Sequence, residues 1–278
     1  MGDCRYCGKP AGFLSGEHSE CAAAHAETLQ KLPQIFSGYI GLAEAPTRTN
    51  ALRIGVEATA TEGFLSADAL KAQVVNGLGL AIRAALSDRS LSDAELSRIQ
   101  EIMNQFGLET NDIVACGAYD LLLQGLTLRD LGQGKIQSRF QITGSIPLNL
   151  KKDESVLWMF KNVARSEPKT NVSYAGGSHG ISFRIMTGVS YRVGASKGHR
   201  VETVTQASKG IGDLYITSSG VYFVGSLDAY SLAHRKITAV EQYSDGIVIS
   251  PNRGKAQTFL LSDPRFATEL ILKVGSLQ

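Results

Sequence analysis

The chain has 278 residues, of which 43% are hydrophobic and 19% are charged, and its net charge is +2. This composition can bury a sizeable core and excludes a disordered chain. The nearly neutral charge argues against a protein that binds nucleic acid with its whole surface, and no apolar run reaches the length of a membrane-spanning helix. The first residues lack the basic and apolar regions of a secretory signal, so we expect a cytoplasmic protein.

A cysteine-histidine cluster opens the chain. Cys4, Cys7, His18 and Cys21 follow the spacing C-x2-C-x10-H-x2-C, and they include three of the four cysteines in the chain. Two thiolates three positions apart can bind one ion from a tight turn, and a second pair completes a tetrahedron. The spacing therefore predicts one structural Zn²⁺ held by these four residues.

His25 is an alternative ligand, because it lies four positions after Cys21 and would share a helix face with it. We favour His18, since this choice leaves a longer hairpin between the two ligand pairs. With four protein ligands the site is closed, which is typical of structural and not hydrolytic zinc. Residues 1–25 are too short for a hydrophobic core and are predicted to form a zinc finger that depends on the metal.

Residues 26–135 are predicted to be helical. An alanine-rich helix runs from Ala22 to Leu32 and ends before Pro33. Ser66 caps a second helix, and Ser92 with Glu95 forms a capping box before a third, which ends at Gly107. A fourth helix opens at Asn111 and Asp112 and continues through residues 121–123. We expect Cys116, in this last stretch, to be a buried small hydrophobe.

From residue 136 the pattern changes to short alternating runs separated by turns. Predicted strands cover residues 140–143, 156–160, 181–185, 189–193, 214–217, 221–224, 247–249 and 258–261. A final helix begins at Asp263-Pro264 and places Phe266, Leu270, Ile271 and Val274 on one face. Trp158 is expected in the core. The predicted fold is therefore α+β, with a zinc finger, a helical middle and a C-terminal β-barrel or bent sandwich (residues 136–278) closed by one helix.

The C-terminal pattern resembles that of bacterial pleckstrin-homology-like and GRAM-like domains. The matching segments, in order, are Gly212–Thr217, Gly220–Gly225, Lys236-Ile237, Val240-Glu241, Asp245–Ile249, Phe259 and the helix after Asp263. In that family a strand ending in Leu-x-Ile-Thr turns into a second strand, a Lys-Ile begins the next, and a hydrophobic helix closes the fold. The resemblance implies a module that docks a protein or an anionic lipid surface.

The helical middle is similar to the TerB-like domain of tellurite-resistance proteins. The matching residues are Leu86–Glu95 and Phe106–Leu108. That family has Asp-Gly at this point, whereas this chain has Asp88-Arg89, so metal binding is not carried over from it.

A basic stretch lies between Arg165 and Lys209, with seven Lys or Arg and only two acidic residues. Glycine-rich loops occur within it, and exposed backbone amides beside basic side chains can hold an anionic group. The candidate binding residues are Arg184, Arg192, Lys197 and Arg200. The alternative is a solvated basic face with glycine turns.

No set of residues follows a recognisable catalytic pattern, so we expect a non-enzymatic adaptor with structural zinc. The expected partner is a protein, with an anionic membrane surface as the second candidate, and nucleic acid is disfavoured. Two alternatives stay open: a nucleic-acid-binding protein that uses the finger and the basic loops, and an enzyme with its site in the helical middle. The sequence does not indicate an oligomeric state.

Overall fold

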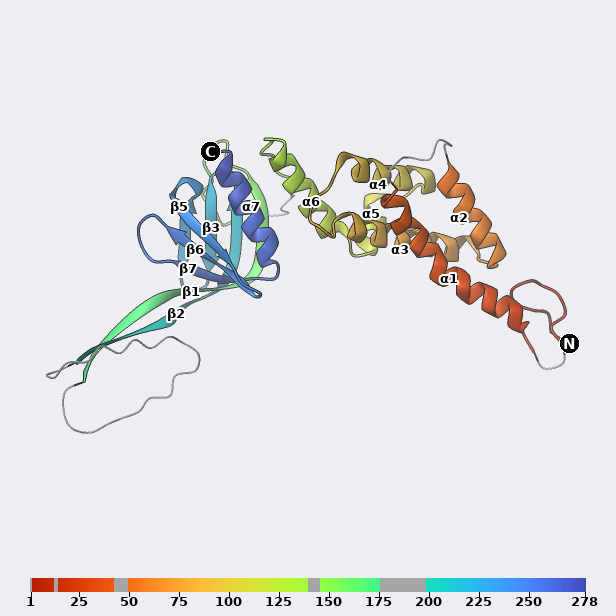
Figure 1. The fold of residues 1–278 in the computed structure, drawn as a ribbon, viewed down its shortest axis with the longest axis horizontal. Coiled ribbons are helices and arrows are strands. Elements are labelled where there is room, and N and C mark those ends of the chain that lie inside the picture. Colours follow the sequence, from red (N-terminus) through yellow and green to blue (C-terminus); the bar gives the residue numbers. More distant parts are fainter. Residues whose placement is uncertain (1, 13–14, 43–49, 140–145, 176–198) are drawn as a thin grey trace. The chain divides into compact units, whose positions relative to one another are not determined.

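The computed structural model describes residues 2–12, 15–42, 50–139, 146–175 and 199–278, with the backbone alone for 171–175 and 199–204. The chain divides into two compact units, Met1–Lys135 and Ile136–Gln278, here called the helical unit and the β unit (Figure 1). Helices make up the first unit, and an antiparallel sheet with one helix makes up the second. The predicted α+β class is confirmed.

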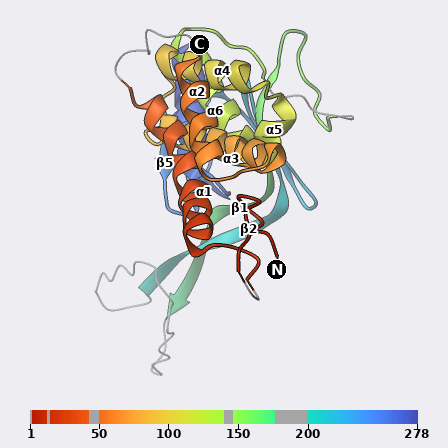
Figure 2. The same cartoon turned by 90° about the vertical axis from the view of Figure 1, so that its right-hand side faces the viewer.

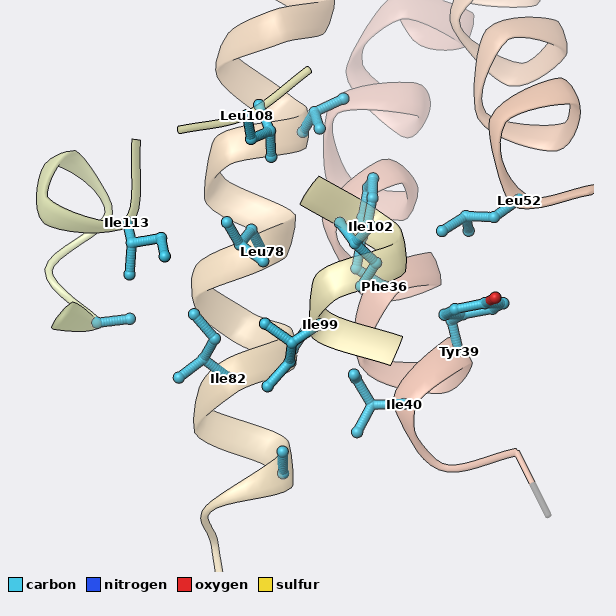
Figure 3. Close-up of a cluster of buried hydrophobic side chains, with 14 of the residues drawn as sticks. Phe36, Tyr39, Ile40, Leu52, Leu78, Ile82, Ile99, Ile102, Leu108 and Ile113 are labelled. Carbon is cyan, nitrogen blue, oxygen red and sulfur yellow. The ribbon is translucent and has the colours of Figure 1, made fainter. Parts of the chain in front are cut away.

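The described part of the helical unit contains six helices. They are α1 (Ser19–Ile40), α2 (Ala51–Glu62), α3 (Ala67–Ala85), α4 (Asp93–Phe106), α5 (Thr110–Ala115) and α6 (Tyr119–Gly132). α1 and α3 lie side by side (Figure 2). The helices surround one hydrophobic core to which Phe36, Leu78, Ile82, Ile99 and Ile102 contribute (Figure 3).

Helix α1 does not end before Pro33, so that prediction was wrong. The helix continues to Ile40, because its second half buries Leu32, Phe36 and Ile40 in the core. This burial outweighs the hydrogen bond that proline cannot donate. α1 also crosses residue 25, the end of the predicted finger, so the finger leads directly into the longest helix of the unit.

The predicted capping residues act as expected. The Ser66 hydroxyl accepts a hydrogen bond from the Ala69 amide, Ser92 and Glu95 form a reciprocal capping box, and Gly107 ends α4 with a φ of 60°. The predicted fourth helix is instead two, α5 and α6. They are separated at Gly117, whose φ of 65° cannot continue a helix. Sequence patterns did not predict α2.

One glycine sets the spacing between α1 and α3. A Cβ atom at Gly77 of α3 would lie 2.2 Å from the Phe36 ring, whose side chain is fully buried. The absence of a side chain at this position therefore lets the two helices pack closely around the ring.

The described residues of the β unit form a seven-stranded antiparallel sheet with the order β4-β3-β2-β1-β7-β6-β5. Its strands are β1 (Val156–Ala175), β2 (His199–Thr217), β3 (Gly220–Gly225), β4 (Ala229–Ala233), β5 (Ile237–Gln242), β6 (Gly246–Pro251) and β7 (Gln257–Leu260). A short 3₁₀ helix, η1 (His234–Lys236), connects β4 to β5, the two edge strands. β1 and β2 continue together as a two-stranded arm beyond the rest of the sheet (Figures 1 and 2).

The last helix, α7 (Pro264–Ser276), packs against the sheet. Phe266, Leu270, Ile271 and Val274 are buried as predicted, and the Phe266 ring meets Trp158 edge to face at 4.9 Å. The predicted strands at 156–160, 214–217, 221–224, 247–249 and 258–261 lie within β1, β2, β3, β6 and β7, apart from residue 261. The predicted strands at 140–143, 181–185 and 189–193 lie outside the described residues. None of the described helices combines the length and the apolar character needed to cross a bilayer.

Candidate metal centre

A tight turn carries the first two candidate ligands. The Gly8 amide donates to the Cys4 carbonyl at 2.8 Å, and the Cys4 amide donates to the Lys9 carbonyl at 2.7 Å. Gly8 has a φ of 69°, a conformation that glycine adopts without strain. The turn therefore folds back within a few residues and directs the thiols of Cys4 and Cys7 to one side.

The other two ligands belong to the beginning of α1. His18 is the residue before the first helical position, and Cys21 follows in the first turn. The backbone amide of His18 lies 3.4 Å from the Cys4 sulfur, which accepts its hydrogen bond. The positive end of the helix dipole thus faces a cluster of thiols, where it favours the thiolate form.

The four donor atoms lie close enough to share one ion. The Nδ1 atom of His18 and the three sulfurs are all within 4.8 Å of one another. Nδ1 is 3.4 Å from the Cys7 sulfur and 3.7 Å from the Cys21 sulfur. A tetrahedral zinc ion with ordinary Zn–S and Zn–N distances separates a sulfur from a nitrogen by about 3.6 Å. The donor set and its spacing therefore fit Zn²⁺.

The second nitrogen of His18 fixes the ring. Nε2 lies 3.0 Å from the Pro10 carbonyl, to which it donates when Nδ1 is free to bind metal. This contact is also the largest cause of a raised pKa of His18, followed by the Cys7 sulfur. A carbonyl behind a ligating histidine is the usual way that proteins hold its ring in place.

The cysteine thiols differ in acidity. Burial works to raise the pKa of Cys4, but hydrogen bonds from the backbones of Cys7, His18 and Tyr6 lower it to about 6. Burial raises the pKa of Cys21 to about 11, and the neighbouring Cys7 and Cys4 add to the effect. Cys4 is thus prepared as a thiolate by the turn itself, whereas Cys21 needs a cation to lose its proton.

His25 does not belong to this cluster. Its Nδ1 lies 2.8 Å from the Gly63 carbonyl, and its ring packs 4.7 Å from the ring of Tyr6. Tyr6 in turn lies 6.5 Å from Phe64, next to Gly63. His25 and Tyr6 therefore attach the Cys4–Cys7 turn to the segment between α2 and α3.

The remaining predicted residues are distributed differently. Arg184, Arg192 and Lys197 lie outside the described residues, and Arg200 has only its backbone described, in β2 opposite Tyr174. Cys116 follows α5, partly buried, where its thiol donates to the Ile113 carbonyl at 3.2 Å. It is not among the cysteines of the metal cluster.

A buried arginine in the β unit was not predicted. The Arg165 side chain is 4% exposed, and its Nε and Nη2 donate to Oε1 of Gln257 at 2.9 and 2.7 Å. Its guanidinium lies over the Tyr230 ring at 4.6 Å and 3.3 Å from an Asp228 oxygen. The alternation of inward and outward side chains along β1 could have indicated its burial, because Val163 and Arg165 occupy successive inward positions.

Comparison with known proteins identifies no relative of this chain. No protein-family model, no curated protein and no solved structure matches this chain.

Proposed function

We propose that this protein is a non-enzymatic adaptor, in which structural zinc stabilises the start of the helical unit and the β unit docks a protein partner. The observation that carries the proposal is an exposed apolar row on the β unit. Ile211 is 60% exposed and Leu260 is 44% exposed, and both lie directly opposite Ala164 in neighbouring strands.

The strand register explains why these side chains form one surface. Residues directly opposite in antiparallel strands point to the same face, so Ile211, Ala164 and Leu260 cross β2, β1 and β7 in one line. Leu227, 79% exposed, lies in the turn after β3, close to Gly210, the residue before Ile211. Contiguous apolar side chains of this kind are more typical of protein interfaces than of solvated surface.

The metal site supports a structural role in the same protein. The four donors could occupy all four positions around Zn²⁺, which would leave none for water or substrate. Zinc would hold the turn at Cys4–Cys7 against the start of α1, and the whole segment would act as a small finger. Intracellular reducing conditions would keep its thiols available as ligands.

The order of elements supports a pleckstrin-like or GRAM-like assignment for the β unit. From the end of β2 through α7, antiparallel strands follow one another and a buried amphipathic helix closes the series. For the helical unit, the TerB-like assignment has one further support. Arg89, where that family has glycine, adopts a φ of 66°, which is the conformation that favours glycine.

The proposal can be tested by changing the apolar row. The double variant Ile211→Ser/Leu260→Ser should keep the melting temperature of the full chain and lose a protein that the wild type captures from native lysate. The matched control is Leu272→Ser/Leu277→Ser, which changes two similarly exposed side chains in and after α7. The captured protein should then bind the purified wild type and the control, but not the row variant.

Other outcomes would support the other functional classes. Binding of wild type to anionic vesicles without a protein partner would indicate a membrane-docking module. Steeply salt-dependent binding to DNA or RNA would indicate the nucleic-acid alternative. Turnover in an activity screen that is unaffected by the row variant would indicate an enzyme. Equal capture by all three proteins would refute the docking surface.

A further inference from the structure

A second feature of the β unit has no role in the proposed docking. A pocket of about 390 Å³ opens between edge strand β4, η1 and the turn that connects β6 to β7; we call it the β4–η1 pocket. Its lining includes three basic side chains, Lys236, Arg253 and Lys255, and no carboxylate belongs to the described residues that line it. Three positive charges around one concave site favour an anion.

Hydrogen bonds to backbone carbonyls hold the backbone of the basic residues in place. The Asn252 amide donates to the Lys236 carbonyl at 2.8 Å, which fastens the β6–β7 turn to η1. On the other side, Nε2 of the buried Gln257 donates to the Lys255 carbonyl at 3.0 Å. The turn between these bonds contains Gly254, with a φ of 103°. The fold therefore fixes the backbone positions from which the basic side chains extend before any ligand binds.

Two of the three charges lack an ion-pair partner among the residues that the structure describes. Lys255 lies 3.6 Å from a Glu167 oxygen, but Lys209 contacts the same oxygen more closely, at 3.3 Å. Within the described parts of the chain, neither Lys236 nor Arg253 has an ion-pair partner. Both side chains are exposed, so an anion could reach them without displacing a carboxylate.

The wall of the pocket carries a further polar group beside apolar surface. The hydroxyl of Tyr230 is buried and lacks a hydrogen-bond partner among the residues that the structure describes. Leu232, also in β4, lines the pocket beside it. As an edge strand, β4 also leaves part of its backbone unpaired on this side. A ligand with an anionic end and a short polar or apolar body would match the basic side chains and the wall formed by Tyr230 and Leu232.

We infer that the β4–η1 pocket binds a phosphomonoester. Its phosphate would lie between Arg253 and Lys236, since a guanidinium binds two phosphate oxygens at once and an ammonium adds a point charge. The rest of the molecule would lie over Tyr230 and Leu232. A volume of about 390 Å³ suits a small metabolite or a single headgroup.

The test titrates the full chain with glycerol 3-phosphate by calorimetry, with glycerol as the uncharged control. In parallel, sedimentation measures binding to phosphatidylcholine vesicles with and without phosphatidic acid, which presents the same phosphomonoester in a membrane. Binding of the soluble compound indicates a metabolite site, and binding of phosphatidic acid vesicles alone indicates a headgroup site.

The variants locate the binding. Lys236→Glu/Arg253→Glu should weaken it roughly a hundredfold, because two charge-assisted contacts are lost. Lys161→Glu reverses an exposed charge that does not line the pocket, and this variant should bind like wild type. Trp158 fluorescence checks that each variant is folded, and Lys236→Gln/Arg253→Gln replaces the reversal variant if that one unfolds.

The inference is overturned if wild type binds neither probe, or if the charge variants bind as tightly as wild type. The outcome is independent of the docking proposal. Ile211→Ser/Leu260→Ser should leave phosphomonoester binding unchanged, and Lys236→Glu/Arg253→Glu should leave capture of the protein partner unchanged.

Discussion

Replacing Gln257 by leucine should destabilise the β unit through Arg165. The Gln257 side-chain oxygen accepts two hydrogen bonds from the guanidinium, and both residues are almost fully buried. A leucine removes both bonds and leaves a buried cation whose remaining oxygen contact is with the half-exposed Asp228. Leaving a buried charged donor without its hydrogen-bond acceptor costs about 3 kcal/mol in free energy of unfolding.

The single tryptophan makes this measurement specific. Trp158 lies in β1 and is 6% exposed, so its fluorescence follows the unfolding of the β unit and not of the helical unit. For a domain of this size each kcal/mol lowers the melting temperature by about 3 °C. Gln257→Leu should therefore melt about 10 °C below wild type when followed by this signal.

Two further variants isolate the cause. Gln257→Glu keeps an acceptor for the guanidinium and should cost much less than leucine. Arg165→Met/Gln257→Leu removes the cation together with its partner and should be more stable than Gln257→Leu alone, because no buried charge is left uncompensated. The reasoning is refuted if Gln257→Leu costs less than about 1 kcal/mol, or if the double variant loses the sum of the two single losses.

Three other measurements test the metal centre, the closing helix and a buried histidine. Purified wild type should contain about one zinc per chain, and Cys21→Ser should lose it while Cys116→Ser keeps it. Leu270→Asp places a charge at a fully buried position of α7 and should cost about 4 kcal/mol or more. Burial lowers the pKa of His234, against the opposing hydrogen bond to the Thr217 carbonyl. As the pH falls, the unfolded state therefore binds the proton before the folded state does. The neutral histidine costs the folded state nothing above about pH 6.5, and the protein loses stability as the pH falls below this value. His234→Gln should flatten this loss in urea titrations between about pH 7.5 and 5.5.

Each of these measurements has a matched control. Full zinc content in Cys21→Ser would contradict the ligand set, and the Trp158 melting signal should not change on chelation. Leu272→Asp, on the exposed face of the same helix, should change stability by no more than about 0.5 kcal/mol. A pH dependence identical in wild type and His234→Gln would rule out the histidine as its source.

Local hydrogen bonds explain which parts of the fold were predictable. The capping box at Ser92 and the C-cap at Gly107 depend on residues within one turn, so the sequence displays them directly. The C-x2-C spacing is likewise a property of one tight turn. By contrast, the passage of α1 through Pro33 depends on burial of Phe36 and Ile40 against other helices, which no local pattern contains.

Helix α2 was not predicted because its sequence gives only a weak local signal. Its buried residues are Leu52, Val56 and Ala60, one per turn and decreasing in size, so the apolar stripe is too narrow to stand out. The β4–η1 pocket was also beyond local patterns. Lys236 and Arg253 are separated by sixteen positions that include two strands, and only the return of β6 beside β5 brings them together.

The β unit thus contains one buried, paired arginine and a set of exposed basic residues at the pocket. The side chain of Gln257 forms hydrogen bonds with both groups. Its oxygen holds the buried Arg165, while its amide nitrogen holds the Lys255 carbonyl at the edge of the pocket. Arg165 already has Gln257, Asp228 and the Tyr230 ring as partners, so a ligand would gain little by contacting it. Lys236 and Arg253 lack such partners among the described residues and retain their full attraction for an anion. The pairing of each cation, more than its charge, therefore determines which one stabilises the fold and which one is available for binding.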